Sequence, residues 1–213
     1  MKKLAFTAFL CFGVLLSFAN PLKYDDVLTI ETFNSASTVG KWWTFDNLKT
    51  NLVTPKDPKS RTYLRLSGTA SDYYVGGMGL YLGKDAMAYN ALVVDVLGAG
   101  TDSGTLRIQL YDDDNNTYQV EMDENYIPLY DDLFEYELTV EWEGWRTVEI
   151  PISDFVLANP GRGDSRWNPS TLNGSGGLLQ IQFIAIAASQ QGSLNIGVDN
   201  LLLAKIANLN KTK

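Results

Sequence analysis

The stretch Glu143-Gly-Trp-Arg-Thr-Val-Glu-Ile-Pro-Ile-Ser-Asp-Phe155 has the form of a β-strand that ends at a proline. Trp145 opens a segment whose side chains alternate as far as Ile150, which is the period-two pattern of a strand with one buried face. Pro151 has no amide hydrogen and therefore ends the hydrogen-bond ladder. We expect Phe155 to pack back against the end of this strand.

Similar strand signals recur along the chain, and no stretch has a sustained 3.6-residue apolar period with caps at both ends. Clusters rich in glycine, proline, aspartate and asparagine separate these segments. Many short strands with turns between them predict one all-β domain, a sandwich or a barrel. The expected strands are 27–33, 62–66, 91–97, 105–111, 117–122, 134–140, 145–150, 178–187 and 194–203.

Alternation within two of these strands separates a core face from a polar face. In Leu106-Arg-Ile-Gln-Leu-Tyr111 the leucines and the isoleucine point one way, and Arg107, Gln109 and Tyr111 point the other way. In Gln180-Ile-Gln-Phe183 the two glutamines share a face. Long hydrogen-bonding side chains could form a ligand-binding floor or a solvated outer surface, and alternation alone favours the solvated surface.

The N-terminus has the pattern of a bacterial-style signal peptide. Lys2 and Lys3 precede an apolar run, 4–16, and Ser17-Phe-Ala19 forms a small-x-small cleavage site. The run is shorter than the roughly 20 residues that span a bilayer. We therefore predict a signal peptide at 1–19, a β-sandwich domain at 20–205, a polar tail at 206–213, and a secreted or periplasmic protein.

Composition excludes several kinds of chemistry. The chain has no histidine, and its one cysteine, Cys11, lies in the expected leader. Histidine-based triads, cysteine nucleophiles and zinc sites with nitrogen and sulfur ligands are therefore excluded. The formal net charge of −8 disfavours nucleic acid and anionic membranes as partners, and it is compatible with cations and neutral ligands.

The sequence resembles one group of β-sandwich domains. The stretch 143–155, followed by Gln180-Ile-Gln-Phe-Ile184 and Gly192-Ser-Leu-Asn-Ile-Gly-Val-Asp-Asn-Leu201, is similar to galactose-binding-domain-like jelly rolls. It most resembles carbohydrate-binding module family 11 and the domain of complex I intermediate-associated protein 30. More loosely, Trp42-Trp-Thr-Phe-Asp46 and Tyr73-Tyr-Val-Gly-Gly-Met-Gly-Leu80 resemble strands of the same families. The resemblance implies an antiparallel β-sandwich of jelly-roll type.

The resemblance also implies a ligand class and a binding face. A sugar has apolar C–H faces and many hydroxyl groups, so its site needs aromatic rings for stacking and planar polar groups for hydrogen bonds. Taken alone, each tyrosine fits an edge position over the sandwich equally well. The expected carbohydrate-binding residues are Tyr74, Arg107, Gln109, Tyr111, Tyr118, Trp167 and Gln182.

Two segments suggest calcium to different degrees. The run Asp112-Asp-Asp-Asn-Asn116 lacks the glycine and glutamate of an EF-hand loop, since Thr117 and Asp123 stand at the sixth and twelfth positions. A hairpin turn is the preferred interpretation of this run. We expect a structural calcium ion instead between the first and last strands, held by Glu31, Asp199 and backbone oxygens.

A second short motif, Gly161-Arg-Gly-Asp-Ser165, matches the pentapeptide that integrin-binding proteins display. Such a motif is weak evidence because short matches arise by chance. It falls between Phe155 and Leu178, in a loop that also carries Trp167, and a sugar-binding loop explains that position equally well. Integrin binding is the disfavoured interpretation.

An enzyme is also disfavoured. Asp131-Asp132 and Asp112 to Asp114 supply carboxyl groups, but neighbours in one strand or turn do not face each other across a cleft. The sequence therefore predicts an exported, non-catalytic carbohydrate-binding module. The alternative is a structural or scaffolding subunit of an extracytoplasmic surface or filament. The expected partner is a polysaccharide or oligosaccharide, with a protein assembly partner under the alternative, and neither nucleic acid nor membrane insertion is expected.

Overall fold

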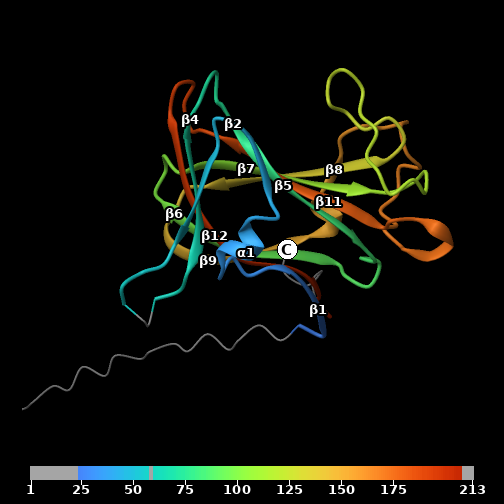
Figure 1. Cartoon of the computed structure of the whole chain (residues 1–213), viewed down its shortest axis with the longest axis horizontal. Coiled ribbons are helices and arrows are strands. Elements are labelled where there is room, and N and C mark those ends of the chain that lie inside the picture. Colours follow the sequence, from blue (N-terminus) through green and yellow to red (C-terminus); the bar gives the residue numbers. More distant parts are fainter. Residues whose placement is uncertain (1–23, 58–59, 208–213) are drawn as a thin grey trace, which may run out of the picture.

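The computed structural model describes residues 24–57 and 60–207, which form two antiparallel sheets packed face to face (Figure 1). Sheet A has the order β3 (Lys49–Val53), β4 (Tyr63–Thr69), β12 (Ser193–Lys205), β6 (Ala91–Ala99) and β9 (Glu143–Pro151), and β1 (Asp26–Glu31) also pairs with β12. Sheet B has the order β10 (Val156–Leu157), β8 (Asp132–Val140), β7 (Gly104–Asp112), β11 (Leu178–Ile186), β5 (Tyr74–Lys84) and β2 (Trp43–Asp46).

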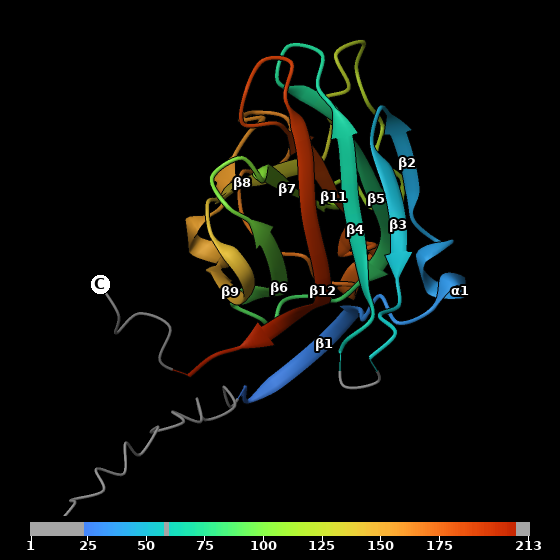
Figure 2. The ribbon, with the colours of Figure 1, turned by 90° about the vertical axis from the view of Figure 1, so that its left-hand side faces the viewer.

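The fold is therefore the expected antiparallel β-sandwich. Figure 2 shows β4 and β12 of sheet A in front of β5 and β11 of sheet B. Helical structure among the described residues is limited to short turns, namely α1 (Ala36–Val39), η1 (Ile152–Asp154) and η2 (Leu172–Gly174). Within the same residues, no helix has the length and apolar character that a membrane span requires.

The core lies between the two sheets and is built from the inward side of every long strand. Leu106, Ile108 and Leu110 of β7 are buried there, as the alternation predicts. The ring of Phe183 on β11 is fully buried and stacks on Trp42, with ring centroids 5.9 Å apart. Trp42 in turn contacts Phe33, which follows β1, so one aromatic group joins the start of the chain to sheet B.

Eight of the nine expected strands are present, with ends shifted by a few residues at most. The strand expected at 117–122 is wrong. Residues 113–131 form one long connection between β7 and β8, with a single isolated bridge between Met122 and Pro128. Val120 and Met122 pack against the cluster around Tyr111 at the end of β7, so their apolar side chains are partly buried over sheet B. Consequently, 112–116 is not a hairpin turn.

Four strands were not in the expected list. The resemblance alone pointed to β2 and β5, and β3 and the two-residue β10 were missed. The expected signal peptide and the last six residues of the expected tail lie outside the described residues.

Phe183→Ala should lower the free energy of unfolding by about 3–5 kcal/mol, because it removes a fully buried ring and leaves a cavity against Trp42. Urea denaturation followed by circular dichroism measures this change. Val156→Ala is the control, since Val156 is 68% exposed on the edge strand β10 and should change stability by about 0.5 kcal/mol or less. A loss below about 1 kcal/mol in Phe183→Ala would contradict this account of the core.

Candidate functional site

The outer face of sheet B carries the polar side chains that the alternation placed together. Gln182 on β11 stands beside Gln109 on β7, and Gln109 stands beside Glu135 on β8. In the neighbouring row, Ile184 stands beside Arg107, which stands beside Glu137. Because Ile181 and Phe183 are fully buried in the core, the alternating glutamines of β11 must point to this outer face.

Hydrogen bonds hold these polar groups in fixed positions. The side-chain amide of Gln109 donates to Oε1 of Glu135 at 2.5 Å, and the Tyr111 hydroxyl donates to Oε1 of Gln109 at 3.2 Å. Nε and Nη2 of Arg107 both donate to Oε1 of Glu137, at 3.0 and 2.8 Å. Gln109 and Arg107 are therefore held in place by the protein itself, and Gln182 beside Gln109 is largely buried, with 8% of its surface exposed.

Aromatic rings from β2 lie over two glycines of β5 on this face. A Cβ at Gly79 would collide with the indole of Trp43 and would lie 2.9 Å from Cγ of Gln182. A Cβ at Gly77 would collide with the ring of Phe45 in the same way. Trp43 is 39% exposed, so its indole packs over Gly79, beside Gln182, with part of its surface open to solvent.

The aromatic residues expected at the site occupy different environments. Tyr111 is only 2% exposed, because Leu133, Leu179 and the 113–131 connection cover it. Burial, with a smaller contribution from the nearby Glu135 carboxylate, raises the pKa of Tyr111. The Tyr111 hydroxyl therefore holds Gln109 by a hydrogen bond, and the buried ring does not present a stacking surface.

The other three expected aromatic residues lie further apart. Tyr74 begins β5, and its hydroxyl donates to Asp46 at 2.6 Å. Tyr118 is half exposed on the 113–131 connection, where its carbonyl oxygen accepts a hydrogen bond from the Tyr81 hydroxyl at 2.8 Å. Trp167 is partly buried and meets Phe134 of the core edge to face, so it anchors its loop to the sandwich.

The sequence reasoning missed Trp43 and Tyr81, which are both exposed large rings of sheet B. The signal was present in the sequence. Trp42 and Trp43 are adjacent, so one ring must face away from the core when the other is buried. The glycines at 77 and 79, two residues apart in one strand, mark a surface where another group approaches the backbone closely.

The two residues expected to bind calcium lie on sheet A, and their side chains already have protein partners. Oε1 of Glu31 accepts hydrogen bonds from the backbone N–H groups of Thr32 and Phe33. Asp199 accepts from Arg61 and Asn200. Burial raises the pKa of the Asp199 carboxyl. The calcium site at this position stays a prediction.

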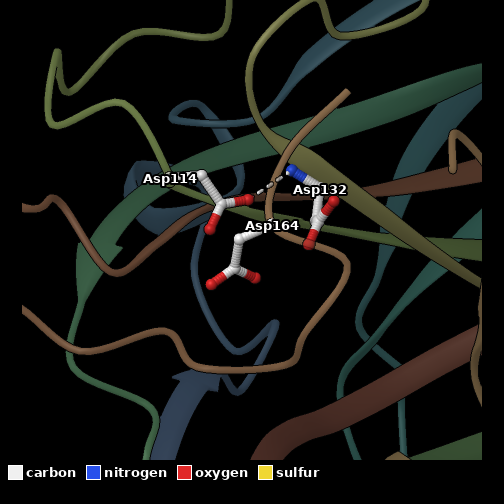
Figure 3. A group of neighbouring side chains, drawn as sticks. All are labelled: Asp114, Asp132 and Asp164. Atoms are coloured by element: carbon white, nitrogen blue, oxygen red, sulfur yellow. Dashed lines mark hydrogen bonds between the residues drawn. The ribbon is translucent and has the colours of Figure 1, made fainter. Parts of the chain in front are cut away.

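A third feature lies at the end of sheet B, where two aspartate runs meet. Asp112 ends β7 and is paired with Asp132, which begins β8. Asp114, Asp132 and Asp164 each place a carboxylate oxygen within 4.8 Å of the others (Figure 3). Strand pairing and the 158–177 loop thus bring the two runs together, which the sequence of each run by itself did not predict.

Burial changes the acidity of this group. Burial, with added repulsion from neighbouring aspartates, raises the pKa of Asp112 to about 8 and that of Asp114 to about 7. Burial is also the main reason that the pKa of Asp131 rises to about 6. Asp131 and Asp132 are completely buried, so a substrate cannot reach them as it would reach the acid and base of a hydrolase.

The integrin-type motif belongs to the same end of the molecule. Arg162 forms an ion pair with Asp123 at 3.0 Å, and Asp164 turns toward Asp114 and Asp132. Arg162 thus contacts the connection between β7 and β8. The Asp164 carboxylate lies close to Asp114 and Asp132 and accepts hydrogen bonds within its own loop, from the Arg166 N–H and the Asn168 side chain. This arrangement favours a role for the motif within the protein.

Comparison with solved structures identifies the architecture. The family 11 carbohydrate-binding module from Clostridium thermocellum, in complex with a β-1,3-1,4-mixed-linked tetrasaccharide, matches 84% of this chain and 95% of its own, with 19% identity and a TM-score of 0.58. The chain has the fold of a family 11 carbohydrate-binding module. The family 30 module of the cellulosomal cellulase Cel9D-Cel44B from the same organism matches 79% of this chain and 93% of its own, with 16% identity and a TM-score of 0.51.

No protein-family model matches the sequence, and a search of curated proteins finds no match. The family 11 fold is thus shared without close sequence similarity. The resemblance to the complex I intermediate-associated protein 30 domain stays a prediction.

Gly79→Ala should displace the Trp43 indole from the outer face of sheet B while the sandwich stays folded, because the added methyl group occupies the position of the indole ring. The chain has five tryptophans, so indole N–H resonances in a ¹H–¹⁵N NMR spectrum report the change. Trp43→Phe assigns the Trp43 resonance, and that resonance should move in Gly79→Ala. The other four resonances are the internal control, and an unmoved Trp43 resonance would contradict the packing described here.

Proposed function

We propose that this protein binds a glycan chain along the outer face of sheet B and performs no catalysis. The observation that carries the proposal is the row in which the exposed indole of Trp43 lies next to Gln182, and Gln182 lies next to Gln109. An open aromatic ring beside fixed, planar, uncharged hydrogen-bonding groups has the chemistry that a sugar requires.

Each part of the row has a distinct task. The Trp43 indole stacks on the C–H face of one sugar ring. Gln182 and Gln109 form hydrogen bonds with the hydroxyl groups at the edge of that sugar ring. Arg107 extends the row on the next register position, where Glu137 fixes the direction of its guanidinium group. Tyr74 and Tyr81 lie on the same strand, β5, and offer further stacking surfaces toward its two ends.

Three of the expected residues take supporting or peripheral roles. Tyr111 holds Gln109 in place from beneath the 113–131 connection. Tyr118 borders the site through its contact with Tyr81. Trp167 fixes the loop that closes the end of the sandwich.

The carboxylates on this face do not form a hydrolase pair. Glu135 and Glu137 lie two residues apart on β8, so they stand side by side on one surface and do not face each other across a cleft. Glu135 accepts from Gln109 and Glu137 accepts from Arg107. Their role in the proposal is to orient the groups that bind the sugar.

The similarity in fold to carbohydrate-binding modules indicates which polymers to test first. The family 11 module whose fold this chain shares binds a β-1,3-1,4-mixed-linked tetrasaccharide in its complex. A secreted or periplasmic location, proposed from the leader, would give this protein access to such polymers. Mixed-linkage β-glucan is therefore the first polymer to test, followed by xylan and mannan.

Trp43→Ala should abolish retardation of the protein by the bound polymer in affinity electrophoresis, with at least about a tenfold loss of affinity, because the stacking surface is removed. Trp145→Ala is the matched control. Trp145 lies on β9 in the opposite sheet, against Tyr63 and Arg61, and its loss should leave retardation unchanged. Circular dichroism of both variants checks that the fold is retained.

Loss of binding in Trp145→Ala but not in Trp43→Ala would place the site on sheet A and contradict the proposal. Absence of retardation by every polymer, together with self-association on size-exclusion chromatography, would favour the structural or scaffolding role.

A further inference from the structure

The aspartates at the end of sheet B present an arrangement that carbohydrate binding does not use. They come from three segments that are far apart in the sequence: the end of β7, the start of β8 and the loop that contains the Gly161–Ser165 motif. Figure 1 shows the 113–131 connection and the 158–177 loop at the same end of the sandwich. The six residues are Asp112, Asp113, Asp114, Asp131, Asp132 and Asp164.

Burial makes this concentration of charge unusual. Asp112, Asp131 and Asp132 have no exposed surface, and each has one carboxylate oxygen without a hydrogen-bond partner. Buried ionised carboxylates need a partner of opposite charge, since transfer from water costs several kcal/mol per ion. Among residues 24–57 and 60–207, no ion pair involves any of the six aspartates, because the nearby Arg162 pairs with Asp123.

The unpartnered oxygen of Asp132 points into the space that the group surrounds. A Cβ built on Gly163 would lie 2.5 Å from Oδ1 of Asp132 and would collide with Oδ2 of Asp114. The missing side chain of Gly163 therefore leaves the two carboxylates facing each other. The other oxygen of Asp132 is held by the backbone N–H of Arg166 at 3.0 Å, which fixes the direction of the free one.

The separation of the oxygens suits one cation. Calcium–oxygen distances of 2.3–2.6 Å allow ligands of one ion to be at most about 5 Å apart. Oxygens of Asp114, Asp132 and Asp164 all lie within 4.8 Å of one another. Backbone N–H groups hold these carboxylates in an irregular arrangement, which Ca²⁺ tolerates better than Mg²⁺, because Mg²⁺ demands a near-ideal octahedron.

We propose that Asp114, Asp132 and Asp164 bind one Ca²⁺ ion, which ties the loop containing Gly161–Ser165 to the ends of β7 and β8. Asp112 and Asp131 are buried alongside these three residues. In this arrangement Asp164 is a metal ligand, and the Arg-Gly-Asp motif is a structural element of the protein. The ion replaces the covalent cross-links that a chain with a single cysteine cannot form.

Isothermal titration of CaCl₂ into chelator-treated protein tests the site directly. We expect binding of one Ca²⁺ per chain, and a weaker response to MgCl₂. Asp164→Asn should lower the Ca²⁺ affinity at least tenfold, because it removes one anionic ligand at an exposed position where the fold tolerates the change. Gly163→Ala should do the same without removing a ligand, because its methyl group enters the space between Asp114 and Asp132.

Two further variants make the test specific. Asp102→Asn changes an exposed aspartate between β6 and β7 and should leave Ca²⁺ affinity unchanged. Asp199→Asn tests the other position considered for calcium. Absence of Ca²⁺ binding would overturn the proposal. Binding that survives both Asp164→Asn and Gly163→Ala but is lost in Asp199→Asn would overturn it as well, by placing the ion on sheet A.

Limited proteolysis gives an independent readout. Arg162 and Arg166 are exposed trypsin sites in the loop that the ion would hold. Ca²⁺ should slow cleavage at these two positions several-fold relative to chelator, and Asp164→Asn should remove that protection. Equal cleavage rates with and without Ca²⁺ in the unsubstituted protein would also overturn the proposal.

Discussion

Burial of the inward side of β11 is the constraint on which the polar outer face of sheet B depends. Ile181 and Phe183 are fully enclosed between the sheets, and Phe183 stacks on Trp42. When alternate side chains of a strand point into the core, the side chains between them must point to the opposite face of the sheet. Gln180 and Gln182 must therefore stand on the outer face, and pairing with β7 places Gln109 next to Gln182.

On the neighbouring strand β5, glycine residues determine which rings can lie on the outer face. Gly77 and Gly79 of β5 leave the sheet surface bare, and the rings of Phe45 and Trp43 lie in the space that side chains would fill. The Trp43 indole lies beside Gln182, so in the proposed binding mode one sugar ring contacts both. The same absence of a side chain recurs at Gly163, where it allows two carboxylates to face each other.

Local pattern predicted eight of the twelve strands in the described residues and failed for the long connection between β7 and β8. The segment 117–122 alternates like a strand, yet its apolar residues find a better partner in Tyr111 and Leu133, and no neighbouring strand pairs with it. Tyr111 itself was correctly assigned to the outer face, but the fold of the 113–131 connection covers it. Whether an outward-pointing residue is exposed depends on the loops that cover it. The conformation of a loop cannot be predicted from a repeating pattern in the sequence.

The sequence by itself determined the all-β architecture, most of the strand faces and the absence of histidine chemistry, because alternation and composition can be read from the sequence alone. Only the tertiary structure decided which rings are open to a ligand and which aspartates meet. Trp43 reaches Gln182 across strands, and Asp164 reaches Asp114 from a loop 50 positions away in the sequence. Such contacts depend on strand pairing between distant segments, and pairing is fixed by burial of the whole core.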